Sequence, residues 1–225
     1  MFESALHEVL QTLENASRRL ERPAARLLAV SKTQPAEAIR GLAALGQVAF
    51  GENYVQEAMH KQQALADLAL EWHLIGHLQS NKAGDAARAF DWVHSVDRPK
   101  LMDALARHRP EQAPPLNVLV QVNIDDEASK HGCRPDEVDA LAQAVAAHPR
   151  LRLRGLMAIP APLPDLERRR QAFRAMKALY DRLAASHPQV DTLSMGMSED
   201  YPLAVEEGAS MVRVGTALFG ARRRD

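Results

Sequence analysis

The chain has 225 residues and a formal net charge of −1, because 28 lysine and arginine residues nearly balance 29 aspartate and glutamate residues. This balance argues against a nucleic-acid-binding surface, which needs a concentrated basic face. The single cysteine excludes an internal disulfide and a multi-cysteine metal site, and it favours a reducing compartment, which we expect to be the cytoplasm. Since the N-terminus lacks the pattern of a signal peptide and no apolar run is long enough to cross a bilayer, we expect neither secretion nor membrane insertion.

Apolar periodicity predicts an N-terminal helix and then a regular alternation of strands and helices. The first helix is expected over residues 4–21, where Leu6, Val9, Leu10 and Leu13 recur at helical spacing. Strands are expected at residues 27–32, 47–50, 72–76, 93–96, 117–124, 153–159, 192–195 and 211–214. Helices are expected at residues 35–45, 54–68, 80–90, 99–107, 135–147, 166–186 and 199–207.

The strict alternation predicts the fold class. Parallel strands joined by right-handed crossovers close into a barrel when eight such units follow one another. We therefore expect an α/β protein with a single (β/α)8 TIM barrel over residues 1–225 and an extra N-terminal helix. Residues 220–225 are too few for a final helix, which suggests that the N-terminal helix covers the resulting gap.

An apolar run that ends on Lys32 is the first sign of chemistry. The lysine stands at the carboxyl end of the first predicted strand, and in α/β barrels ligands bind at the carboxyl ends of the strands. A partly desolvated lysine there can attack a carbonyl group as the neutral amine, so Lys32 is a candidate Schiff-base lysine. Alternatively, the side chain extends to the rim of the barrel or pairs with a carboxylate.

Two glycine-containing segments follow the seventh and eighth predicted strands. They read Ser-Met-Gly-Met-Ser at 194–198 and Arg-Val-Gly-Thr-Ala at 213–217. Barrels often bind phosphate with the loops after their last two strands, through backbone N–H groups and short hydroxyls such as those of Ser194, Ser198 and Thr216. Each segment is also explained as an ordinary strand-end loop, with Ser198 as a helix N-cap.

An imine-forming lysine that faces a phosphate site across one barrel mouth suggests pyridoxal 5'-phosphate as the cofactor. Arg213, at the end of the eighth strand, would meet the pyridine nitrogen as a hydrogen-bond donor and leave that nitrogen unprotonated. The ring is then a weaker electron sink, which suits storage of an imine or narrow proton-transfer chemistry better than transamination. A salt bridge at the rim is the alternative for Arg213.

Six motifs in order resemble those of the pyridoxal phosphate homeostasis protein family. They lie at residues 29–32, 50–57, 72–82, 155–159, 193–198 and 212–216. The resemblance implies a barrel related to the N-terminal domain of alanine racemases, with pyridoxal 5'-phosphate bound as a Schiff base to Lys32. It implies that the other cofactor-binding residues are Asn53, Met157, Ser194, Ser198, Arg213, Gly215 and Thr216.

The same resemblance implies a role in intracellular pyridoxal phosphate homeostasis, in which the protein buffers the cofactor or delivers it to dependent apoenzymes without an established turnover reaction. The alternative is an amino-acid racemase. Against it, the chain lacks the second β domain of alanine racemases, which supplies a catalytic tyrosine, and Ala36 stands where a racemase carries a phosphate-binding tyrosine. Because racemases pair through the missing domain, we expect a monomer.

His77 occupies a position where the resembled family commonly has proline, so the local loop is expected to differ in shape. His73 and His77 share strand parity, but without a third ligand we interpret them as rim or core histidines and expect no metal site. Cys133, which follows His131 and Gly132, is interpreted as a free surface thiol.

Four further polar features have structural interpretations. Glu52 is expected as a carboxylate at a helix start, and Tyr54 as an amphipathic rim residue. The basic run at residues 168–170 is expected to be a solvated helix face, and the run at residues 222–224 a charged tail.

Overall fold

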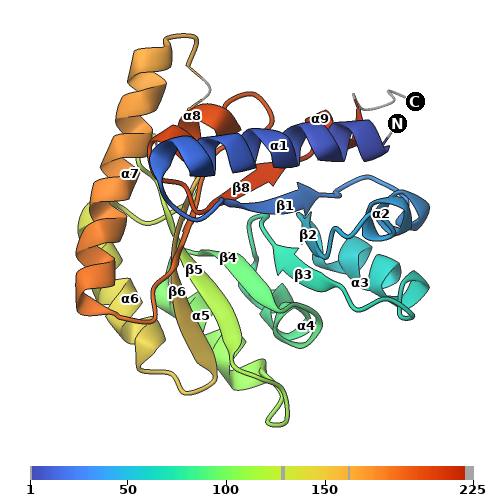
Figure 1. Ribbon diagram of the computed structural model, residues 1–225. Helices are drawn as coiled ribbons and strands as arrows, with labels where there is room; N and C mark the ends of the chain where they lie inside the picture. The colour runs from blue at the N-terminus through green and yellow to red at the C-terminus, as the bar shows by residue number, and fades with distance from the viewer. Residues whose placement is uncertain (1, 128–129, 162, 221–225) are drawn as a thin grey trace.

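The computed structural model describes residues 2–127, 130–161 and 163–220, and its core is a closed barrel of parallel strands (Figure 1). The strands follow one another around the barrel in sequence order, and the last pairs with the first. They are β1 (Arg26–Val30), β2 (Ala49–Glu52), β3 (Glu71–Leu74), β4 (Trp92–Val96), β5 (Leu116–Val122), β6 (Leu151–Ala158), β7 (Thr192–Ser194) and β8 (Met211–Val214). The predicted (β/α)8 TIM barrel is confirmed.

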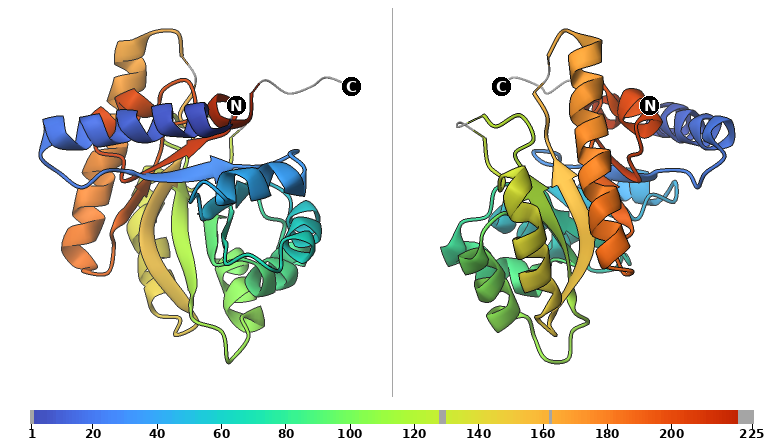
Figure 2. Two further views of the ribbon diagram at one scale, coloured as in Figure 1. Left: turned by 45° about the vertical axis from the view of Figure 1, so that its right-hand side comes forward. Right: turned by 90° about the vertical axis from the view of Figure 1, so that its left-hand side faces the viewer.

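The helices lie outside the barrel, as the two turned views show (Figure 2). They are α1 (Phe2–Leu20), α2 (Ala36–Ala43), α3 (Val55–Ala64), α4 (Ala83–Ala89), α5 (Pro99–His108), α6 (Val138–Ala146), α7 (Leu166–Ser186), α8 (Tyr201–Glu206) and α9 (Thr216–Phe219). Short 3-10 turns, η1 (Ser80–Lys82) and η2 (Pro135–Glu137), open the helices that were predicted at 80–90 and 135–147. None of the described helices combines the length and the apolar composition needed to cross a membrane.

Several strands end before their predicted boundaries, among them β3 and β5, which each leave a longer loop at the barrel mouth. β3 ends at Leu74, two residues early, and the following loop packs against the backbone of Asn53. A Cβ atom on Gly76 would lie 2.2 Å from the Asn53 carbonyl oxygen, so only glycine permits this approach. β5 ends at Val122 because the chain turns away, with Asp126 at a φ of 52°.

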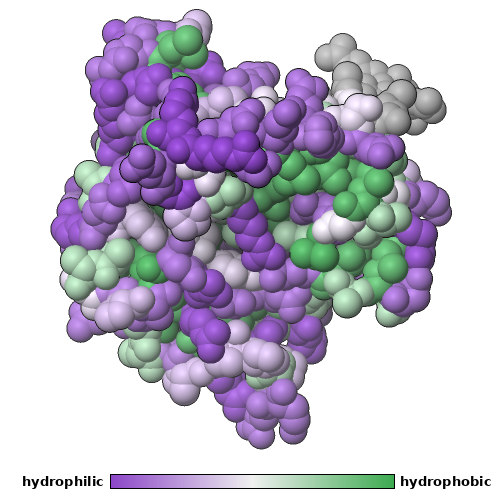
Figure 3. Space-filling view, viewed as in Figure 1, coloured by the Kyte–Doolittle hydropathy of each residue, from purple (hydrophilic) through white to green (hydrophobic). Residues whose placement is uncertain are grey.

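The N-terminal helix α1 closes the side of the barrel where the final helix is short. Its buried residues Leu6, Val9 and Leu13 face the barrel, and the helix contacts α2, α8 and the four-residue α9. The ring of Phe2 meets the ring of Phe219 edge-on, with centroids 6.0 Å apart. The outward surface of α1 is hydrophilic (Figure 3). This packing agrees with the hypothesis that α1 replaces a full final helix.

The barrel interior contains a polar histidine pair among apolar side chains. His73 stacks on Trp92, and its Nδ1 lies 2.9 Å from Nε2 of His94. Burial lowers the pKa of His73 and lowers the pKa of His94 further, so both rings are neutral near pH 7. Nε2–H of His73 donates to Glu71, which also pairs with Arg26 at 2.8 Å. Burial alone would raise the pKa of Glu71, but these two contacts lower it to about 2.

Candidate functional site

A cavity of about 520 Å³ opens at the carboxyl ends of the strands, where active sites of such barrels lie. Loops from both halves of the barrel contribute to its wall. Of the eight residues predicted to bind a cofactor, six line this cavity: Lys32, Asn53, Ser198, Arg213, Gly215 and Thr216. Six of the predicted residues therefore gather at one cavity, whereas the other two, Ser194 and Met157, lie elsewhere.

Lys32 stands on a tight turn just beyond β1. The strand ends at Val30, and a hydrogen bond of 3.0 Å from the Gln34 N–H to the Ser31 carbonyl closes the turn. Thr33 takes the left-handed conformation, with a φ of 64°, which strains a β-branched residue. Lys32 is half-buried at the cavity wall. The strained turn thus places the amine at the mouth of the barrel.

A buried network of charged groups holds this turn from behind. Lys61 Nζ donates to the Ser31 carbonyl at 2.8 Å, to Glu52 Oε1 at 2.8 Å and to Glu57 Oε1 at 2.6 Å. Glu52 Oε1 also accepts from the Ser31 hydroxyl at 2.6 Å, and Glu57 Oε1 accepts from the Thr33 N–H at 2.6 Å. Both residues that flank Lys32 are therefore bonded to the network.

The expectation that Glu52 is a carboxylate at a helix start was wrong. Glu52 is the last residue of β2 and is fully buried, and burial raises the pKa of its carboxyl group against the opposing effects of Lys61 and Ser31. The network itself was missed by the sequence reasoning. The spacing of Glu57 and Lys61, four residues apart on a helix, was the one available signal.

Arg213 reaches the cavity from inside the barrel and is held on two sides of its guanidinium. Nη1 donates to the carbonyl and the hydroxyl of Ser194 at 2.9 and 2.8 Å, and Nη2 donates to the Ala158 carbonyl at 2.8 Å. Burial lowers the pKa of Arg213 to about 10, so the group stays protonated at neutral pH. Nε makes no hydrogen bond within the described chain, so this edge is available to a ligand.

Ser194 and Met157 do not line the cavity. Ser194 is fully buried and contacts Arg213, so it fixes the orientation of that side chain. Met157 is also fully buried, in a cluster with Trp92 and Leu119 inside the barrel. Asn53, by contrast, lines the cavity next to Gly76, at the end of β2.

The loops after β7 and β8 meet at Ser198. Its hydroxyl oxygen accepts from the backbone N–H of Gly215 at 3.2 Å and of Ala217 at 3.4 Å. Ser198 was interpreted as the N-cap of the next helix, but α8 begins at Tyr201 and Asp200 is in the N-cap position. A hydroxyl and two backbone N–H groups thus converge at one end of the cavity, as a phosphate site requires.

The loop after β7 is tied to α7 by a residue that was expected to be solvated. Arg169 is buried, donates to the Leu163 carbonyl at 3.0 Å and pairs with Asp200 at 3.6 Å. Asp200 in turn accepts from the Met197 N–H at 2.8 Å. Within the run at 168–170, only Arg168 is exposed as predicted, whereas the run at 222–224 lies outside the described residues.

Two expectations for residues near the mouth need correction. Cys133 is no surface thiol: the backbone folds back onto β5, with the Cys133 N–H bonded to the Gln121 carbonyl at 2.9 Å, and burial raises the pKa of the thiol to about 12. His73 and His77 do not share a strand face. His73 lies inside the barrel, whereas His77 lies in the loop after β3 and lines the cavity.

Comparison with known proteins identifies the family. The sequence profile of the alanine racemase N-terminal domain matches residues 5–223. A pyridoxal phosphate homeostasis protein from Pasteurella multocida is 50% identical over 226 residues, which cover 98% of this chain and 97% of that protein. The chain belongs to the pyridoxal phosphate homeostasis protein family. A member from Pseudomonas aeruginosa is 55% identical over 196 residues, covering 87% of this chain and 84% of that protein.

Solved structures agree with this assignment. PipY of Synechococcus elongatus is 38% identical, and the match covers 98% of this chain and 100% of PipY. The TM-score is 0.89 for PipY without pyridoxal phosphate and 0.86 for PipY with it bound. Alanine racemase from Corynebacterium glutamicum is 20% identical with a TM-score of 0.68, and this chain covers 61% of it. That likeness extends to the fold alone.

Proposed function

We propose that this chain binds pyridoxal 5'-phosphate in the cavity at the barrel mouth and serves intracellular pyridoxal phosphate homeostasis as a carrier without a turnover reaction. One observation carries the proposal. A lysine amine, a buried arginine and the loops that meet at Ser198 all border the same cavity. Membership of the family and the cofactor-bound PipY structure support it.

The residues of the cavity fit this cofactor. A volume of about 520 Å³ lies within the range of roughly 300–1,000 Å³ typical of ligand pockets. Arg213 presents an N–H donor for a ring nitrogen, and its charge survives burial. The backbone N–H groups of Gly215 and Ala217, which here donate to the Ser198 hydroxyl, are donors of the kind that bind phosphate oxygens.

Bound pyridoxal phosphate supplies an aldehyde that condenses reversibly with a primary amine. Lys32 is the amine at the cavity wall, and the turn behind it limits the directions from which this amine approaches the ligand. The network of Ser31, Glu52 and Lys61 keeps that turn in place. A covalent but reversible attachment, combined with a phosphate site, is what a carrier requires.

Arg213 decides which chemistry the site favours. Its guanidinium only donates hydrogen bonds, so it binds a ring nitrogen that carries no proton. A ring without this positive charge withdraws electrons weakly, which disfavours carbanion chemistry. Ser194 acts through Arg213 as a positioning residue, since it accepts from the guanidinium.

Transfer of the cofactor tests the carrier function. Protein loaded with pyridoxal phosphate and freed of excess ligand is mixed with the apo form of an aminotransferase, and the restored activity is measured. We expect restoration by the wild type and by Lys177→Ala, a control at a surface lysine, and a large loss with Lys32→Ala. Failure of the wild type to restore activity would contradict the delivery role.

Chiral analysis of L-alanine after incubation with the loaded protein separates carrier from racemase. We expect no enzyme-level formation of the D-isomer. Formation that disappears in Lys32→Ala would establish catalysis instead. We further propose a cytoplasmic location, a monomer and apoenzymes that depend on the cofactor as partners; size-exclusion chromatography with light scattering tests the oligomeric state.

A further inference from the structure

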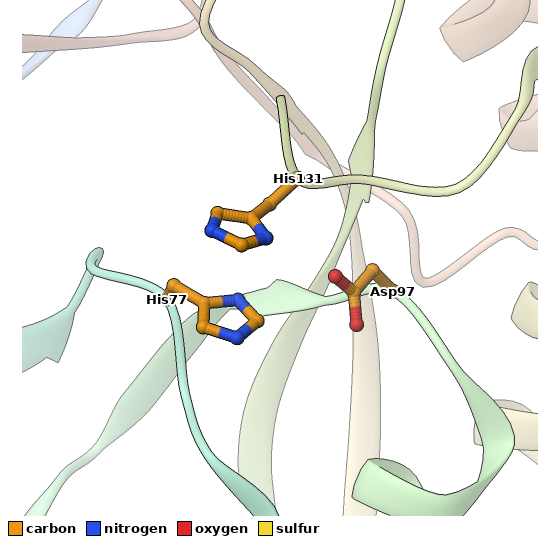
Figure 4. A group of neighbouring side chains, drawn as sticks. All are labelled: His77, Asp97 and His131. Atoms are coloured by element: carbon orange, nitrogen blue, oxygen red, sulfur yellow. The ribbon is translucent and has the colours of Figure 1, made fainter. Parts of the chain in front are cut away.

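Three side chains with metal-binding atoms meet at the rim of the cavity. His77 follows β3, Asp97 follows β4 directly, and His131 lies in the segment after β5, so three neighbouring strands deliver one residue each (Figure 4). One ligand atom from each residue lies within 4.8 Å of the other two. The two imidazole rings stack face to face, with centroids 3.6 Å apart and an angle of 13° between the planes.

The backbone after β5 explains why His131 reaches this position. The segment returns to the strand through two hydrogen bonds of 2.9 Å, from Cys133 to Gln121 and from Asn123 to Cys133. Gly132 permits the return, since it has a φ of 122° and a Cβ atom there would lie 2.6 Å from the Asn123 nitrogen. The Gln121 amide also donates to the His131 carbonyl at 3.3 Å. The backbone of His131 is therefore fixed.

Asp97 is oriented by its neighbour in sequence. Arg98 pairs with Asp97 Oδ1 at 2.5 Å and donates from its other terminal nitrogen to the Leu78 carbonyl at 2.9 Å. Oδ2 has no such contact within the described chain and remains available as a ligand. The arginine partly offsets the negative charge, but outer partners of this kind commonly orient metal-binding carboxylates.

We propose that His77, Asp97 and His131 bind a divalent transition-metal ion, with Zn²⁺ as the expected one. Two imidazoles and one carboxylate form a donor set that zinc accepts in proteins, whereas magnesium and calcium prefer oxygen ligands alone. Three protein ligands leave a fourth position for water or a ligand group. His77 and His131 also line the cavity, so the ion would lie in its wall.

Metal binding requires the two stacked rings to rotate and the three ligand atoms to move closer together. Ligand atoms around tetrahedral zinc lie about 3.4 Å apart when the bonds are about 2.1 Å long, whereas here the limit is 4.8 Å. Both histidines are exposed, so their rings can rotate apart and turn towards one ion without displacing a core side chain. The backbone of His131 is held by its hydrogen bonds to β5, so its adjustment stays within the side chain.

Zinc titration of a tag-free, chelator-stripped protein against a colorimetric competitor tests the site, with bound metal counted by mass spectrometry after dialysis. We expect one Zn²⁺ per chain. His77→Gln and His131→Gln should each weaken binding by at least about tenfold, as should Asp97→Asn. His148→Gln is the matched control, because His148 pairs with Asp103 at 3.4 Å elsewhere on the surface; this variant should bind like the wild type.

Absence of stoichiometric binding, or equal losses in the control and the three ligand variants, would overturn the proposal. The histidine variants change exposed side chains, so their melting temperatures should match the wild type and a loss of binding is not a loss of fold. The zinc site does not depend on the proposed cofactor. Pyridoxal phosphate binding measured on the same preparations shows which of the two proposals fails.

Discussion

The buried network behind Lys32 makes a quantitative prediction for Lys61→Met. Without the ammonium group, Glu52 is a fully buried carboxylate whose one remaining hydrogen-bond partner in the described part of the chain is the Ser31 hydroxyl. Such a group takes up a proton, which costs about 3.4 kcal/mol at pH 7 for an ordinary pKa of 4.5. We therefore expect urea unfolding at pH 7 to show a loss of stability of about 3 kcal/mol, close to the values found for broken buried pairs.

The pH dependence of this loss tests its cause. In the variant, the pKa of folded Glu52 lies above its unfolded value, so the protonated form is favoured on folding and stability falls as pH rises above 4.5. Because the pKa of Glu52 is already raised in the wild type, the deficit should shrink by at most about 1.4 kcal/mol per pH unit as pH falls from about 7 to about 5, and only where the wild-type carboxyl group is ionised. Adding Glu52→Gln should remove this trend. Lys177→Met, which breaks a surface pair with Asp181, is the control. A pH-independent loss would show that protonation of Glu52 is not its cause.

Three further predictions concern stability and reactivity. His73 and His94 are buried as neutral rings with lowered pKa values, so the stability should fall as pH drops below the unfolded pKa of 6.5, by up to about 1.4 kcal/mol per pH unit for each ring. Unfolding curves from about pH 7.5 to about pH 5.5 check this. His94→Asn should flatten the pH dependence, whereas His7→Asn, at an exposed position, should not. Deleting residues 1–22 removes the buried face of α1, where each large apolar side chain contributes roughly 1.5–3 kcal/mol to the free energy of unfolding, so the melting temperature should drop by about 10 °C or more. An unchanged melting temperature would rule out the hypothesis that α1 covers the barrel in place of a final helix. Cys133, with a pKa near 12, should react with a thiol reagent only as fast as the chain opens; rapid reaction of the native protein would contradict its burial.

The sequence was sufficient to predict the barrel because its signals are local and repeated. The strand β1 is a continuous apolar run over residues 27–30, and helix stops such as Gly46 and Gly208 have the positive φ values that favour glycine. The boundaries that were wrong lie where tertiary contacts decide. β3 stops early because Gly76 packs on Asn53, which no local pattern reveals.

The gathering of the candidate residues at one cavity was predictable as far as it depends on strand ends. Lys32 follows β1 and Arg213 lies near the end of β8. These two strands pair with one another, so the closed sheet brings both residues to the same barrel mouth. The supporting groups were not predictable in this way. Lys61 lies on a helix and reaches Glu52 only in three dimensions, and Cys133 is buried because its segment doubles back. His77 and His131 are 54 positions apart in the printed sequence and stack only across two loops.

The central claim is that Lys32 is the residue that holds pyridoxal phosphate. Its most direct test is an absorbance titration with the cofactor, followed by borohydride reduction and peptide mass mapping. We expect a saturable visible band and one phosphopyridoxyl adduct, on Lys32. Absence of an adduct, or adducts scattered over surface lysines such as Lys100 and Lys177, would show that Lys32 does not hold the cofactor.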